Sequence, residues 1–190
     1  MLPKESLQAL KDGNNRFVQK KPLHPHQNDQ RLREVLPEQH PFAVILTCSD
    51  SRVPPEILFD QGIGDLYVIR TAGNVIDDVV IGSIEYAVTY LRVPLVVVMG
   101  HQNCGAVTAA ALGGISAGHI SSLIQKLRPA VEIARGVSGD LVANAVDANT
   151  LLVAAELKNC RPELIEFYAS GSIDILAARY NLDSGKVTFF

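Results

Sequence analysis

The apolar positions of this chain gather into short, nearly continuous runs. Three such runs, rich in valine, isoleucine and leucine, cover residues 42–47, 65–71 and 95–100. A continuous apolar run of this length is typical of a strand that is covered on both faces of a sheet. We therefore predict three buried strands in the first half of the chain.

Helical spacing of apolar residues separates these runs. Strands that alternate with helices predict an α/β fold, in which helices flank both faces of a mostly parallel central sheet. Within the first predicted helix Gly13 is a weak position, because glycine disfavours a helix interior. The predicted helices are residues 6–19, 79–91, 105–112, a stretch after His119 that is interrupted near Pro129, and 141–158.

The two ends of the chain depart from this alternation. Residues 20–30 are polar and contain two prolines, which predicts an extended N-terminal arm after the first helix. Residues 173–180 and 186–190 flank the turn-forming residues Asp183, Ser184 and Gly185. This arrangement predicts a C-terminal hairpin strand.

Length and composition fit one globular domain. The chain has 190 residues, of which 47% are hydrophobic and 19% charged, so we expect a large core, a broad subunit interface, or both. We find no repeat or linker and expect a single domain over residues 1–190. Its N-terminal helix and arm would cover residues 1–40, and its metal-binding α/β core residues 41–190.

Charge and hydropathy exclude two classes of partner. The net charge of -3 gives no electrostatic footprint for nucleic acid or an anionic membrane surface. No apolar run approaches the roughly 20 residues that a membrane-spanning helix needs. We therefore expect neither a nucleic-acid partner nor a membrane partner.

The cysteines and the N-terminus bear on location. Three cysteines are too few for a disulfide framework and suit metal or thiol chemistry in a reducing compartment. The N-terminal segment lacks the apolar stretch of a signal peptide. We expect a cytoplasmic protein, with the periplasm as the alternative if a leader has been removed.

Metal-ligating side chains follow two of the predicted strands. Cys48 comes after the first run, and His101 and Cys104 come after the third. In parallel sheets, ligands bind beyond the carboxyl ends of the strands. Three protein ligands with an open fourth position are typical of catalytic zinc, and thiolates with an imidazole favour zinc over magnesium or calcium. We predict one Zn²⁺ per subunit at these residues.

Asp50 and Arg52 lie close enough to Cys48 to reach the same pocket. Arg52 can hold Asp50 through a bidentate pair, and the held carboxylate can orient a zinc-bound water. The chemistry implied is attack of zinc-bound hydroxide on a small electrophile. Two thiolates neutralise the dication, so the bound water should be less acidic than on a zinc held by three histidines. We therefore expect activity to rise toward alkaline pH.

Together these motifs resemble those of the β-class carbonic anhydrases, of the plant-like type with an open site. The resemblance implies reversible hydration of carbon dioxide to bicarbonate and a proton, with zinc on Cys48, His101 and Cys104. It also implies that Asp50 and Arg52 form the catalytic dyad. The matching segments are GNNRF, CSDSRVPPE, IRTAGN, SIEYAV, GHQNCGA and YNLDSGKV.

The same resemblance implies residues that bind substrate and a partner copy. Gln39 falls where the family places a glutamine that hydrogen-bonds the substrate, usually from the dimer partner. Tyr67 and Tyr86 correspond to aromatic residues of the carbon dioxide pocket, and Ala72 to another pocket position. Gly105, beside the metal segment, completes this predicted set. The family implies a homodimer or homotetramer.

Three alternatives remain open from sequence. Carbonyl sulfide or carbon disulfide could replace carbon dioxide as the linear substrate of the same site. A non-catalytic scaffold that binds zinc or bicarbonate would have no use for the Asp50–Arg52 pair. A thiol-redox protein is disfavoured because the chain contains no C-x-x-C motif.

Ile45 replaces a tryptophan that some bacterial members use in a regulatory bicarbonate site, so we expect that site to be absent.

Overall fold

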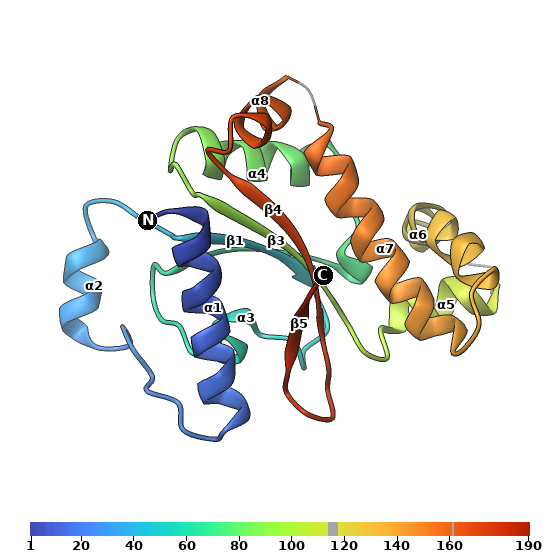
Figure 1. Cartoon of the computed structure of the whole chain (residues 1–190), viewed down its shortest axis with the longest axis horizontal. Helices are drawn as coiled ribbons and strands as arrows, with labels where there is room; N and C mark the ends of the chain where they lie inside the picture. The colour runs from blue at the N-terminus through green and yellow to red at the C-terminus, as the bar shows by residue number, and fades with distance from the viewer. Residues whose placement is uncertain (114–117, 161) are drawn as a thin grey trace.

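The computed structural model describes residues 1–113, 118–160 and 162–190. Its centre is a five-stranded sheet in the order β2-β1-β3-β4-β5 (Figure 1). The first four strands are mutually parallel, and β5 runs antiparallel to β4. This confirms the predicted α/β class and the C-terminal hairpin. The strands are β1 (Ala43–Cys48), β2 (Leu66–Thr71), β3 (Leu95–His101), β4 (Asp174–Tyr180) and β5 (Val187–Phe189).

Helices cover both faces of the sheet (Figure 1). Along the buried strand β1, Val44 and Leu46 pack on one face with residues of α4, α7 and α8, whereas Ala43 and Ile45 pack on the other with α1 and α3. The helices are α1 (Pro3–Val18), α2 (Asp29–Val35), α3 (Pro55–Leu58), α4 (Asp78–Thr89), α5 (Gly105–Leu112), α6 (Ile120–Arg135), α7 (Leu141–Lys158) and α8 (Glu163–Ala169), with a short 3₁₀ turn η1 (Ala72–Asn74).

Three local predictions were wrong or incomplete. β2 is an edge strand and only half buried, because β1 is its one neighbour in the sheet. α6 continues through Pro129, whose exposed ring costs one backbone hydrogen bond while the buried face of the helix packs on its neighbours. The arm forms a helix from Asp29, capped by the Asn28 side chain, and the sequence reading also missed α8.

Two buried aspartates hold the arm against the domain. Asp60 accepts hydrogen bonds from the Arg16 side chain and from the backbone N–H groups of Leu23 and His24. Burial raises the pKa of Asp60, but these hydrogen bonds together bring it below its ordinary value. The Asp65 carboxylate hydrogen-bonds the His26 ring and accepts from the Arg31 side chain. The arm therefore follows a fixed path across the loop that connects α3 to β2.

No helix among the described residues is both long enough and apolar enough to cross a membrane.

Gly13 allows α1 to approach the end of α3 closely. A Cβ atom built at Gly13 would lie 1.7 Å from the Phe59 carbonyl oxygen, so α1 reaches the end of α3 only because this residue has no side chain. Gly82 lies on the exposed face of α4, and a Cβ atom built there would have no described atom within 4 Å apart from its chain neighbours and the backbone of its own helix. The two glycines therefore make a matched pair.

Replacing each glycine by alanine should have opposite effects on stability. Gly82→Ala should raise the free energy of unfolding by about 0.5–1 kcal/mol, because alanine favours the helix. Gly13→Ala should lower it by about 2 kcal/mol or more, because the new methyl group meets backbone. Chemical denaturation of both variants measures the difference, and equal stabilisation by both would contradict the close approach of α1.

Candidate active site

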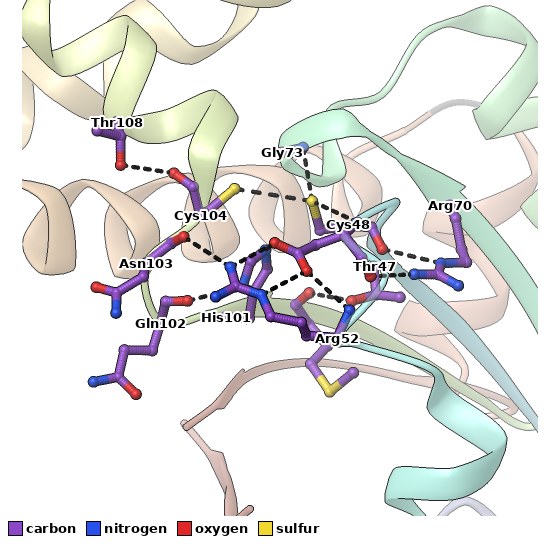
Figure 2. Close-up of polar contacts among 12 residues, drawn as sticks. Thr47, Cys48, Arg52, Arg70, Gly73, His101, Gln102, Asn103, Cys104 and Thr108 are labelled. Carbon is purple, nitrogen blue, oxygen red and sulfur yellow. Dashed lines mark hydrogen bonds and ion pairs between the residues drawn. The ribbon is translucent and has the colours of Figure 1, made fainter. Parts of the chain in front are cut away.

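Three metal-ligating side chains meet beyond the carboxyl ends of β1 and β3. Cys48 is the last residue of β1, His101 is the last residue of β3, and Cys104 directly precedes α5. Their potential ligand atoms all lie within 4.8 Å of one another, and the two sulfur atoms are 3.9 Å apart (Figure 2). All three residues are buried. The structure thus brings the three predicted ligands together.

The His101 ring is oriented for metal binding. Its Nδ1 lies 2.9 Å from the Gln102 carbonyl oxygen, which can only accept, so Nδ1 carries a proton and the neutral ring has its lone pair on Nε2. Nε2 is buried and has no hydrogen-bond partner among the described residues. A buried polar atom without a partner is costly, and a bound cation would remove that cost. The donor set therefore fits a zinc ion.

The contact between the two thiols shifts their pKa values in opposite directions. A hydrogen bond from the Cys104 thiol lowers the pKa of Cys48; burial opposes this, and the His101 side chain and the backbone N–H groups of Gly73 and Asp50 lower it further. The same contact and burial raise the pKa of Cys104. These contacts favour the thiolate form of Cys48, which is the form of cysteine that binds a metal. A bound dication would favour loss of the Cys104 proton as well.

Asp50 is held as a carboxylate facing this cluster. Arg52 donates to both of its oxygens, from Nε at 2.9 Å and from Nη2 at 2.7 Å. These hydrogen bonds hold the pKa of Asp50 well below its usual range. Asp50 Oδ2 lies 3.9 Å from His101 Nε2, so the carboxylate sits beside the potential ligand atoms. The Asp50–Arg52 ion pair is therefore formed within one chain.

Hydrogen bonds to and from the backbone also hold the loops around this cluster. Arg70 donates to the carbonyl oxygens of Cys48 and Asp50 and so fixes the loop that carries both residues (Figure 2). Gly73 donates its N–H to the Cys48 sulfur at 3.3 Å, and its carbonyl oxygen accepts from Asn149. Gly73 has a φ of 71°, a left-handed conformation that is typical of glycine in a tight turn, the turn expected at this residue from the sequence.

The predicted substrate residues lie in three places. Ala72 directly precedes Gly73, and Gly105 directly follows Cys104, so both border the Cys48–His101–Cys104 cluster. Tyr67 packs on the edge strand against the core cluster under α4 and α7. Gln39 and Tyr86 instead line a separate surface cavity of about 450 Å³, which none of the three potential ligands lines. Within one copy of the chain, Gln39 and Tyr86 therefore do not reach the Cys48–His101–Cys104 cluster.

The cluster predicts a selective effect of cysteine substitution on metal binding. Cys48→Ser should lose tightly bound zinc, because the thiolate that completes the set is gone. Cys160→Ser is the matched control, since Cys160 packs against the core cluster under α4 and α8 and is not among the three grouped ligands. Zinc per chain, measured by atomic emission after dialysis, should stay near one in the control. Equal zinc content in both variants would contradict the site.

Comparison with known proteins places these features in a family. The family model described as carbonic anhydrase matches residues 43–187. A carbonic anhydrase of Mycolicibacterium smegmatis is 42% identical over 97% of this chain and 92% of its own length.

Solved structures share the fold. The β-carbonic anhydrase CafA of Aspergillus fumigatus is 31% identical, covers 85% of this chain and 82% of its own, and superposes with a TM-score of 0.68. One of two tetrameric β-carbonic anhydrases from Sordaria macrospora is 24% identical, with coverage of 94% and 93% and a TM-score of 0.79. The family model, the bacterial relative and the shared fold together show that this chain belongs to the β-carbonic anhydrases.

Proposed function

We propose that the chain catalyses the zinc-dependent, reversible hydration of carbon dioxide to bicarbonate and a proton. The observation that carries this proposal is the buried Cys48–His101–Cys104 cluster next to a carboxylate, Asp50, that an arginine holds in place. Both parts are needed, because the cluster alone would fit a purely structural metal.

Cys48, His101 and Cys104 would hold the ion through two sulfur atoms and Nε2 of the imidazole. Bound zinc would supply a Lewis acid that makes water more acidic and nucleophilic, and two thiolate ligands would move this activity toward alkaline pH. A set of three protein ligands leaves one position open for that water.

Asp50 then acts on the attacking water. As a carboxylate whose protonation Arg52 suppresses, it can only accept a hydrogen bond, so it selects the water orientation in which a lone pair faces the substrate. Arg52 also donates to the Asn103 carbonyl oxygen at 3.4 Å, which ties the dyad to the segment between His101 and Cys104. The dyad and the metal ligands are therefore held in one frame.

We further propose that a second copy of the chain completes the substrate pocket, in a homodimer or homotetramer. Gln39 and Tyr86 face a cavity away from the cluster of their own chain. The ring centroids of Tyr86 and Tyr90 are 5.3 Å apart, with the rings tilted by 34°, and the two residues are 46% and 73% exposed. Aromatic residues are enriched at subunit interfaces. Their position supports donation of Gln39 and Tyr86 to a neighbouring subunit.

Asp50→Asn tests the role of the dyad. The variant should keep its zinc, because Asp50 is not among the three ligands, and should lose carbon dioxide hydration by about 100-fold or more, because the amide can turn a donor toward the water. Asp12→Asn, an exposed aspartate on α1, is the matched control and should keep full activity. Stopped-flow hydration with a pH indicator, on protein of known zinc content, measures both.

The same assay separates the competing functions. Zinc-loaded wild-type protein that hydrates no carbon dioxide at any pH would refute the proposal. Turnover of carbonyl sulfide or carbon disulfide by that protein would then assign a hydrolase, and no turnover would assign a binding role.

Mixing two inactive variants tests the shared pocket. In Cys48→Ser the metal is lost, and in Gln39→Ala the proposed contribution to the neighbour is lost. A dimer with one copy of each has one complete site, so random reassembly should recover roughly a quarter of wild-type activity from two nearly inactive parents. A mixture no more active than the mean of its parents would contradict donation across the interface.

A further inference from the structure

Gln102 connects the segment that carries His101 and Cys104 to the C-terminal hairpin. Its side-chain Nε2 donates to the Asp183 carboxylate at 2.8 Å, and its Oε1 accepts from the Leu182 N–H at 3.0 Å. Oε1 also lies 3.4 Å from the Asp183 N–H, and the Gln102 N–H donates to the Tyr180 carbonyl oxygen at 2.9 Å. The side chain points away from the sulfur atoms (Figure 2). Gln102 therefore grips the turn between β4 and β5 by both ends of its amide.

The backbone of the same residue orients a predicted metal ligand. The Gln102 carbonyl oxygen is 2.9 Å from His101 Nδ1, and it is the hydrogen bond that directs Nε2 toward the cluster. Partners that fix the second nitrogen of a ligating histidine set both its tautomer and its orientation, and their loss typically weakens metal binding. Any rotation of the peptide after Gln102 would move this acceptor.

The hairpin that Gln102 grips is itself anchored. Asn14, buried in α1, donates to the Gly185 carbonyl oxygen at 2.9 Å and accepts from the Val187 N–H at 2.8 Å. Gly185 lies so close to Phe17 that an added Cβ would come within 2.9 Å of that ring. The turn is thus fixed against α1, and it offers Gln102 a rigid support.

From these contacts we propose that Gln102 is a positioning residue for zinc: its side-chain grip on the hairpin turn holds its carbonyl oxygen against His101. The inference rests on the proposed metal site but not on the identity of the substrate. It differs from a purely structural role in one respect. A residue that merely stabilises the hairpin would change stability, whereas this residue changes zinc affinity.

Exchange of the donor and acceptor provides the sharpest test. Gln102→Ala should weaken zinc binding by about 10- to 100-fold, measured by competition with a chromophoric chelator. In the double variant Gln102→Glu with Asp183→Asn, the new asparagine amide can donate to the new carboxylate, which still accepts from Leu182. This variant should recover most of the affinity, while Gln102→Glu alone, with two facing carboxylates, should not.

A matched control separates the hairpin from the ligand. Ser184→Ala removes the hydroxyl that accepts from the Lys186 N–H at 3.3 Å in the same hairpin and leaves the Gln102 contacts in place. It should bind zinc as tightly as the wild type, whatever its melting temperature. If Gln102→Ala does not fold, Asp183→Ala removes only the Nε2 hydrogen bond and should show a smaller loss in the same direction.

The outcomes keep this inference apart from the proposed function. If Gln102→Ala binds zinc as tightly as the wild type, or if the double variant recovers nothing, the positioning role is wrong even where the wild type hydrates carbon dioxide. If the affinities follow the predicted order but zinc-loaded wild type hydrates no carbon dioxide, the positioning role stands and the proposed function fails.

Discussion

Parallel pairing of β1 with β3 is the constraint on which the site depends. Thr47 pairs with Met99, so Cys48 and His101 leave the sheet at the same edge, although they lie far apart in sequence. Cys104 joins them because α5 begins at the next residue, with the helix packed over the sheet end. Neither Cys48 nor His101 could reach the other if the strands ran antiparallel. The parallel direction of β1 and β3 therefore places the potential metal ligands together.

Burial fixes this pairing and at the same time tunes the site. β1 and β3 are buried along their whole length between two helical layers, so a shift of one residue would turn every side chain to the opposite face. The same burial removes water from the thiols and from the imidazole, which leaves His101 Nε2 without a partner among the described residues. Asp50, by contrast, is reached from the solvent side by Arg52. The buried Cys48–His101–Cys104 cluster and a half-buried carboxylate paired with Arg52 thus lie side by side.

Much of this arrangement was predictable from sequence. Continuous apolar runs indicated β1 and β3, and the Cys, His and Asp–Arg motifs indicated the cluster and the dyad, because strand ends and side-chain chemistry are local properties. The failures lie where neighbours decide. β2 has an apolar run but lies at the sheet edge, and Pro129 sits in a helix that packing maintains. Arg70, Gly73 and Gln102 make hydrogen bonds to or from backbone atoms, and the pattern of residue types along the chain does not display such bonds.

The central claim is a metal held by two sulfur atoms and one imidazole nitrogen, with a fourth position left to a non-protein ligand. X-ray absorption spectroscopy at the zinc edge, on the protein as purified, tests it most directly. The account predicts two sulfur neighbours at about 2.3 Å and nitrogen or oxygen neighbours at about 2.0–2.1 Å, one of which exchanges with added anions. A zinc ion with only oxygen and nitrogen neighbours, or one closed by four protein ligands that no anion displaces, would contradict the account.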